Sequence, residues 1–305
     1  MPRFTSSVDG AQLFYRDYKP LDTDESKDQC KTSAQPALVF IHGWPYSSLM
    51  YENIAVPLCQ CHNFRCIAPD RRGFGKSDWD SPQSNGKISY TVFAQDTAHL
   101  LENVLNVGPF VVIASSMGPG ESILAFEESE YFRQNCKGFI WISPSLPGTL
   151  PGLDNHSTGP QAVWDSILES LATHRAEYVS SALPGTLGGK TALPLSPGIL
   201  GQYERIVEDA DALAIQLCAH IIRSVDFTGK LRRLGENTAV PVLCIHGDSD
   251  NGTPYESSTR VVQDIVPRVK VRLYEQGAHG LQITHRERLI EDILGFIRNE
   301  VISPL

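Results

Sequence analysis

At 305 residues the chain is long enough to bury a sizeable core, as one large domain or as one domain with an insertion. It is 41% hydrophobic and 20% charged, which predicts an ordered globular protein. A formal net charge of −9 argues against nucleic acid or an anionic membrane as partner, and no apolar run is long enough to span a bilayer.

The predicted elements begin with a β-hairpin over residues 3–18, with Asp9-Gly10 as its turn, followed by an exposed polar loop over 20–36. From there apolar strands alternate with helical patterns. Strands are predicted at 37–41, 64–68, 110–114 and 139–142, and helices at about 47–61, at 91–106 and from the turn after 114 to about 132. This alternation predicts an α/β protein with a mainly parallel sheet covered on both faces.

The alternation stops between about 147 and 236, where the pattern is helical throughout. One helix is expected around 164–171 and another over 206–222. We predict a helical lid (cap) over 147–236, inserted into a core made of 1–146 and 237–305. Its side chains Trp164, Tyr178, Leu183 and Tyr203 are expected to line a substrate pocket. The remaining elements are strands at 240–245 and 269–274 and a helix at 284–300.

The seven cysteines are scattered, odd in number and without repeat spacing. The first ten residues lack the apolar core of a signal peptide. Together these features predict free thiols in a reducing compartment, and so a cytoplasmic protein. Cys59-Gln-Cys61-His62 has no second ligand pair, and no metal or cofactor site is predicted.

Residues 110–120 carry the strongest functional signal, because an apolar run ends abruptly in small residues and a serine before a helical pattern. This is the layout of a nucleophile elbow, usually spelled G-x-S-x-G and here Ala114-Ser-Ser-Met-Gly118. The spacing to Gly118 makes Ser116 the candidate nucleophile and leaves Ser115 as its neighbour. On its own the motif also fits an ordinary helix N-cap, so the rest of the chain has to decide.

Three further strand ends carry suggestive residues, at His42-Gly-Trp-Pro45, His246-Gly-Asp-Ser-Asp250 and Gly277-Ala-His-Gly280. Ser116, Asp250 and His279 follow one another in the order that a hydrolase triad of this sheet type requires. A histidine takes the proton of a serine hydroxyl, and a carboxylate fixes that histidine's tautomer. The oxyanion would be bound by the backbone N–H groups of Met117 and Trp44.

Each assignment has an alternative. Asp248 could be the acid, although the spacing after the strand favours Asp250 and Asp248 is expected to cap the loop. His279 could be a satisfied core histidine. His42 and His246 precede glycines at strand ends and are expected to be structural, as is Glu121 in the first turns of the elbow helix.

The chain resembles the cofactor-free (non-haem) chloroperoxidase and arylesterase group of α/β-hydrolase fold proteins. The matching stretches lie, in order, at residues 40–45, 70–77, 115–121, 226–228, 246–250 and 277–281, with Thr284-His285 after them. The lid matches poorly apart from its exit at 226–228. The resemblance implies an eight-stranded, mostly parallel sheet, with Ser116 as nucleophile, Asp250 as acid, His279 as base and an oxyanion hole at Trp44 and Met117.

Members of that group hydrolyse esters or lactones without metal or haem, and many also form peracids from carboxylic acids and peroxide. We therefore expect a serine hydrolase for an ester or lactone of a small organic molecule, acting through an acyl-enzyme and with perhydrolase activity on the side. The alternative is a non-hydrolytic biosynthetic enzyme (cyclisation, isomerisation or C–C cleavage) or a ligand receptor on the same scaffold. No nucleic acid or membrane partner is expected, and a homodimer is left open.

Overall fold

The computed structural model describes residues 2–21, 35–79, 88–148, 161–188 and 195–302. In these ranges the strands form one eight-stranded sheet in the order β1-β2-β4-β3-β5-β6-β7-β8. The strands are β1 (Arg3–Thr5), β2 (Gln12–Tyr18), β3 (Ala37–Ile41), β4 (Cys66–Pro69), β5 (Phe110–Ser115), β6 (Cys136–Ile142), β7 (Val242–Gly247) and β8 (Lys270–Tyr274). β2 runs antiparallel to β1 and β4, and the later neighbours are parallel, so the predicted mainly parallel sheet is confirmed.

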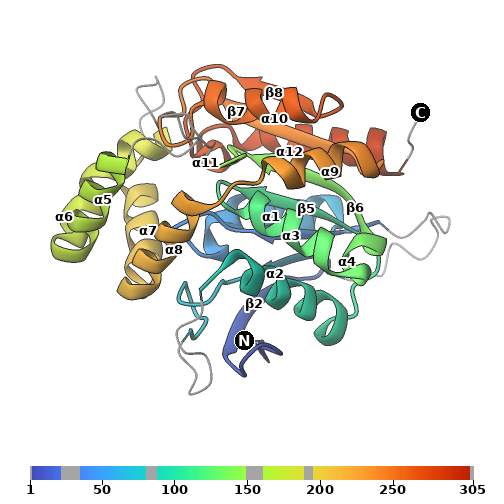
Figure 1. The fold of residues 1–305 in the computed structure, drawn as a ribbon, viewed down its shortest axis with the longest axis horizontal. Helices are drawn as coiled ribbons and strands as arrows, with labels where there is room; N and C mark the ends of the chain where they lie inside the picture. The colour runs from blue at the N-terminus through green and yellow to red at the C-terminus, as the bar shows by residue number, and fades with distance from the viewer. Residues whose placement is uncertain (1, 22–34, 80–87, 149–160, 189–194, 303–305) are drawn as a thin grey trace.

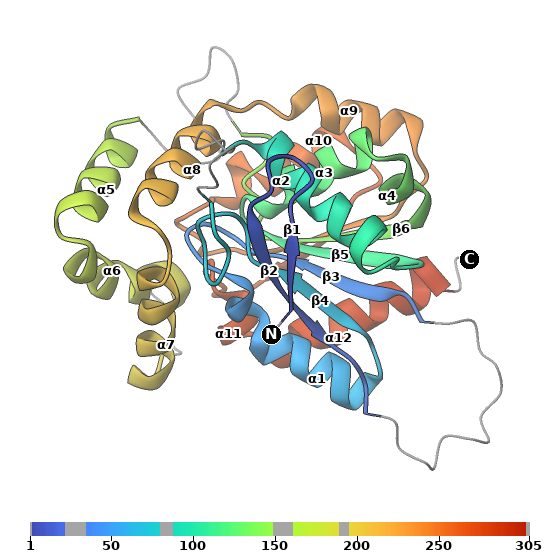
Figure 2. The same cartoon turned by 90° about the horizontal axis from the view of Figure 1, so that it is seen from below.

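Helices cover both faces of the sheet (Figures 1 and 2). One face carries α1 (Glu52–His62), which follows a short 3-10 helix at Ser48–Tyr51, together with α11 (Leu281–Thr284) and α12 (Arg286–Phe296). The other face carries α2 (Tyr90–His99), α3 (Gly118–Glu128), α4 (Glu130–Asn135), α9 (Thr228–Asn237) and α10 (Thr259–Ile265). Short π-helical turns at Leu100–Val104 and Ile297–Ile302 extend α2 and α12.

Of the described helices between β6 and β7, all but α9 stand to one side of this sandwich, beside the carboxyl ends of the parallel strands (Figures 1 and 2). They are α5 (Gln161–Thr173), α6 (Arg175–Leu183), α7 (Pro197–Glu208) and α8 (Ala212–Ser224), with a π-helical turn at Pro184–Gly188 after α6. Their contacts with the core include two side-chain hydrogen bonds to backbone carbonyl groups. The Trp44 indole donates to the carbonyl oxygen of Ile215 (3.1 Å), and the Tyr203 hydroxyl donates to that of Met50 (3.1 Å). That residues 147–236 act as a lid stays a prediction.

Two expected helices are each divided in the structure. The predicted helix over 206–222 is wrong as a single element, because α7 ends at Glu208 and the Asp211 side chain caps α8 by accepting from the backbone N–H groups of Leu213 (2.8 Å) and Ala214 (3.0 Å). Likewise, the helix expected up to residue 132 breaks at Ser129, whose hydroxyl caps α4. Short polar side chains compete for backbone groups in this way, so an apolar pattern can continue across a helix boundary.

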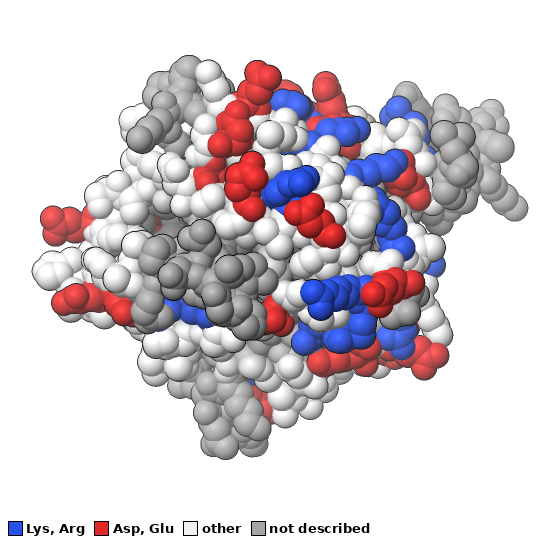
Figure 3. Space-filling model, turned by 45° about the horizontal axis from the view of Figure 1, so that its top comes forward, with Lys and Arg blue, Asp and Glu red and all other residues white. Residues whose placement is uncertain are grey.

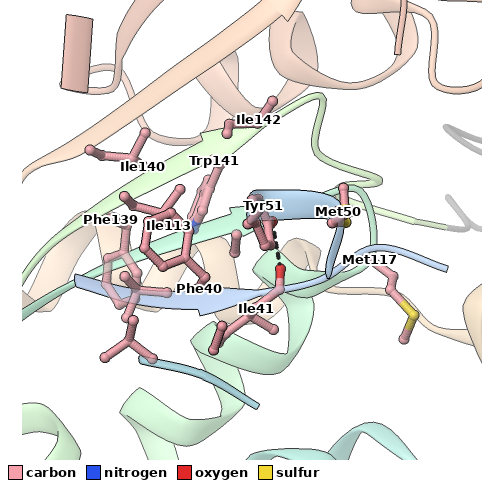
Figure 4. Packing of buried hydrophobic residues seen from close by; sticks show 14 of the residues in the cluster. Phe40, Ile41, Met50, Tyr51, Ile113, Met117, Phe139, Ile140, Trp141 and Ile142 are labelled. Atoms are coloured by element: carbon pink, nitrogen blue, oxygen red, sulfur yellow. Dashed lines mark hydrogen bonds between the residues drawn. The ribbon is translucent and has the colours of Figure 1, made fainter. Parts of the chain in front are cut away.

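The central strands are buried from end to end, as expected for a sheet covered on both faces. Phe40, Ile113 and Trp141 come from three neighbouring strands and pack together in the core (Figure 4). The buried Tyr51 hydroxyl donates to the carbonyl oxygen of Ile41 at the end of β3 (2.8 Å; Figure 4). The strand ends that carry the candidate functional residues therefore extend from a closely packed core.

On the face in Figure 3, Lys and Arg side chains lie among Asp and Glu side chains. None of the helices in the described ranges is long and apolar enough to cross a membrane. Six of the seven cysteines lie in the described ranges and all six are free thiols, and Cys30 lies outside those ranges.

Candidate active site

Ser116 lies at a sharp turn between β5 and α3. Its φ of 57° falls in the left-handed region, which a side chain rarely adopts, and this conformation turns the serine out of the strand. A Cβ on Gly118 would come within 2.6 Å of the Ile41 carbonyl oxygen, so the strand and helix approach each other too closely for any other residue. The same hypothetical Cβ would lie only 3.3 Å from the Ala114 side chain. The missing side chain of Gly118 therefore leaves room for the Ala114 methyl, where the usual motif has glycine.

The loop after β3 passes directly beside this serine. A Cβ on Gly43 would lie 3.1 Å from the Cβ of Ser116, so the following residue, Trp44, is held next to the candidate nucleophile. Among the hydrogen bonds between described residues, none is donated by the backbone N–H of Trp44 or of Met117. Within the described part of the chain both amides therefore lack an acceptor, as donors to an oxyanion must, and their role in an oxyanion hole stays a prediction.

Asp250 and His279 are brought together from the loops after β7 and β8. The Nδ1 of His279 lies 2.8 Å from Oδ2 of Asp250, and both side chains are buried. The other oxygen, Oδ1, accepts from the backbone N–H groups of Gly252 (2.9 Å) and Thr253 (2.9 Å). An aspartate held on both oxygens is fixed in orientation, and with Nδ1 donating to it the imidazole keeps Nε2 unprotonated.

Burial by itself would raise the pKa of Asp250, but the neighbouring histidines and the Thr253 amide lower it to about 2. Burial would also lower the pKa of His279, but the charge of Asp250 and the hydrogen bond to it raise that pKa above its usual 6.5. The pair therefore combines an ionised carboxylate with a strengthened base.

The alternative candidates occupy other environments. Asp248 is exposed and its carboxylate accepts from Ser249 (2.8 Å) rather than from a histidine. Burial lowers the pKa of His246, whose ring contacts Thr259 Oγ1 (2.7 Å) and the Thr253 carbonyl oxygen (2.7 Å). Its Nε2 lies 3.6 Å from the Asp250 carboxylate, so His246 packs against the loop that carries Asp250.

Glu121 and His42, which were expected to be structural, belong to a buried network beneath the loop that follows β3. Glu121 pairs with the guanidinium of Arg71 and accepts from Thr97 Oγ1 (2.6 Å). The Nε2 of His42 accepts from the Arg71 backbone N–H (3.0 Å), and burial together with the Arg71 charge holds the His42 pKa well below 6.5. Both residues are occupied in holding the loop, as expected of structural residues.

Ser116 and His279 line the same cavity, which has a volume of about 1000 Å³ and lies between the strand ends and the helices α5 and α6. Trp44, Trp164, Tyr178 and Leu183 also line it, and the rings of Trp44 and Trp164 lie 5.3 Å apart. The structure differs from expectation for Tyr203. That side chain is fully buried, and its hydroxyl is bonded to Met50 and Gln282 rather than lining the cavity.

Sequence reasoning missed Ser145 and Thr253, two hydroxyl residues that line this cavity and contact the candidate triad. The Ser116 hydroxyl is hydrogen-bonded to that of Ser145 (3.2 Å) rather than to His279. Thr253 Oγ1 lies 3.2 Å from the Asp250 carboxylate and 3.3 Å from the Nδ1 of His279. The one available signal was position, because both residues follow strands at the functional edge. Within the described part of the chain, no three His, Cys, Asp or Glu side chains gather as metal ligands would.

A serine on a strand-turn-helix elbow, with an Asp-His pair at the carboxyl edge of a mainly parallel sheet, is the arrangement of the α/β hydrolase fold. The family model of that description matches residues 36–286, and the chain belongs to this family.

Its relatives include chloroperoxidase-like proteins. A non-heme chloroperoxidase from Streptomyces lividans is 29% identical, with 96% of this chain and 99% of the relative covered. A bifunctional esterase/perhydrolase from Acinetobacter calcoaceticus is 27% identical, with 97% and 99% covered. The crystal structure of a bromoperoxidase from Bacillus anthracis superposes with a TM-score of 0.80 at 25% identity, covering 98% of this chain and 100% of that one.

Proposed function

We propose that this protein is a serine hydrolase of carboxylic esters or lactones, with Ser116 as nucleophile, His279 as general base and Asp250 as the acid of a triad. The observation that carries the proposal is the Asp250–His279 hydrogen bond (2.8 Å) on a cavity whose wall also holds Ser116 in its left-handed turn. The named relatives, an esterase/perhydrolase and a non-heme chloroperoxidase, support the same class of chemistry.

In this mechanism the Nε2 of His279 takes the Ser116 proton while Oγ attacks the ester carbonyl carbon. The negative charge that develops on the carbonyl oxygen is bound by the N–H groups of Trp44 and Met117, and each donor supplies about 3–4 kcal/mol of transition-state stabilisation. Asp250 stabilises the imidazolium, which then protonates the leaving alcohol. Water, activated by the same histidine, hydrolyses the acyl-enzyme.

The cavity favours a bulky, uncharged substrate. Its volume of about 1000 Å³ is at the upper end of small-molecule pockets, and aromatic and aliphatic side chains such as Trp164, Ile167 and Leu171 dominate its described lining. No Lys or Arg occurs among those described lining residues, and the one carboxylate, Glu256, is exposed. A carboxylate-bearing ester would find no counter-charge there.

Perhydrolysis is a second activity that the same acyl-enzyme permits. The similarity to the esterase/perhydrolase from Acinetobacter calcoaceticus supports this activity. Hydrogen peroxide would replace water as the attacking nucleophile, and the product would be a peracid. We expect halogenation that depends on acetate and peroxide and that disappears in Ser116→Ala.

The deciding experiment pairs two serine variants. Ser116→Ala should abolish hydrolysis of p-nitrophenyl esters and labelling by a fluorophosphonate. Ser115→Ala removes a neighbouring buried hydroxyl for which the described residues offer no hydrogen-bond partner, and this variant should keep both the hydrolysis and the labelling. Unchanged ester hydrolysis in Ser116→Ala would exclude Ser116 as the nucleophile, and a wild-type protein with neither hydrolysis nor labelling would favour the non-hydrolytic enzyme or receptor.

A further inference from the structure

Ser145 is a second hydroxyl at the candidate nucleophile. It lies in the loop after β6, is 6% exposed and lines the same cavity as Ser116 and His279. Its Oγ is 3.2 Å from Oγ of Ser116. The proposed hydrolase mechanism does not use the Ser145 hydroxyl.

The loop that carries Ser145 is held from three sides. The Ser145 backbone N–H donates to the Ser116 carbonyl oxygen (2.7 Å), so the two residues are tied through their main chains as well. Ser258 Oγ donates to the Pro144 carbonyl oxygen (2.7 Å), and Thr253 Oγ1 donates to that of Ser143 (3.2 Å). The position of the Ser145 hydroxyl is therefore built into the site rather than left to a mobile surface loop.

We propose that Ser145 positions the molecule that attacks the acyl-enzyme, and so favours water over alcohols as acceptor. This inference rests on the proposed function. In the free enzyme the Ser145 hydroxyl has the Ser116 hydroxyl as its partner. Acylation converts the Ser116 oxygen into an ester oxygen, which has no proton to donate and accepts weakly. The Ser145 hydroxyl then needs a new hydrogen-bond partner, and in this proposal that partner is the water molecule that attacks the acyl carbon.

Water has two protons, so it can donate one hydrogen bond to the Nε2 of His279 and the other to the Ser145 oxygen, whereas an alcohol has one proton and can make only the first of these bonds. In the step itself the water oxygen bonds to the acyl carbon while one of its protons passes to the Nε2 of His279. The tetrahedral intermediate then expels the Ser116 oxygen, which takes that proton back, and a carboxylic acid leaves. Ser145 is neither acylated nor deprotonated, and its hydroxyl orients the water.

The experiment measures how the acyl-enzyme divides between water and added methanol, as the ratio of acid to methyl ester formed from a p-nitrophenyl ester. This ratio does not depend on which step limits the overall rate. Loss of one hydrogen bond to the attacking water should shift the ratio toward the methyl ester by about three- to tenfold in Ser145→Ala. Ser145→Thr keeps the hydroxyl and should retain the wild-type ratio.

Ser143→Ala is the matched control, because it removes from the same loop a buried hydroxyl that has no hydrogen-bond partner within the described part of the chain. Its ratio should equal that of the wild type. An unchanged ratio in Ser145→Ala, or an equal shift in Ser143→Ala, would overturn the role of Ser145. With the wild-type enzyme, two ester substrates that share one acyl group but have different alcohols must also give the same ratio of acid to methyl ester. Different ratios would mean that no shared acyl-enzyme exists, and this result alone would refute the proposed function as well.

Discussion

The Asp250 carboxylate accepts a hydrogen bond from Nδ1 of His279 at 2.8 Å, between two loops that are 29 residues apart in the chain. The backbone N–H groups of Gly252 and Thr253 hold the other carboxylate oxygen, so the aspartate cannot turn away from the ring. This contact sets the tautomer of the imidazole and the charge beside it. Most of the site's expected pH behaviour and sensitivity to mutation follows from it.

The first prediction concerns pH. Burial opposes protonation of His279, but the Asp250 charge and hydrogen bond raise its pKa above 6.5. Because the base must be unprotonated, kcat/KM for a non-ionisable ester should fall as pH drops through that raised pKa and level off above it. Asp250→Asn removes the charge but keeps the burial, and its midpoint should move to lower pH. A wild-type midpoint below 6.5 would contradict this assignment.

The second prediction separates the two candidate acids. Asp250→Asn should lower kcat by about 10³- to 10⁴-fold, because an amide at this position favours the wrong imidazole tautomer. Asp248→Asn makes the same chemical change at an exposed side chain two residues away and should stay close to wild type. Steady-state kinetics on one p-nitrophenyl ester compares the two. If the Asp248 variant lost more activity, the assignment would have to be reversed.

The third prediction tests the elbow. Gly118→Ala would place a methyl 2.6 Å from the Ile41 carbonyl oxygen, which is backbone and cannot give way cheaply. We expect a loss of about 1–3 kcal/mol in the free energy of unfolding, together with lower activity. Gly295 lies inside α12, where no described atom beyond its chain neighbours and the helix's own backbone comes within 4 Å of the new methyl, so Gly295→Ala should instead gain about 0.5–1 kcal/mol. Urea unfolding measures both, and equal effects would argue against a close approach at the elbow.

The fourth prediction concerns the buried ion pair between Glu121 and Arg71, beneath the loop that follows β3. Glu121→Ala leaves the buried guanidinium of Arg71 without its carboxylate, and we expect a loss of about 3–5 kcal/mol in unfolding free energy. Glu127→Ala, on the same helix as Glu121, breaks a pair with the exposed Arg233 of α9 and should cost much less. Denaturant midpoints for the two variants give the comparison. Similar losses would show that the buried pair is not holding the loop.

Much of the fold could be predicted because the strands are short apolar runs and the sheet is buried on both faces. The strand at 37–41 was predicted to the residue, and those at 110–114 and 269–274 to within one residue at either end. Helix boundaries were less predictable. The Asp211 and Ser129 side chains divide continuous apolar patterns by bonding to backbone N–H groups, and an apolar periodicity does not register such caps.

By itself, the sequence determined the order of the elements and the residue types at the strand ends, because parallel strands place these ends on one edge. This was sufficient to select Ser116, Asp250 and His279 as candidates. Tertiary structure alone decided which groups touch. It paired His279 with Asp250, buried Tyr203 away from the cavity and placed the Ser145 hydroxyl against Ser116. Such contacts join loops that are distant in the chain, and no local spacing encodes the direction in which a side chain points.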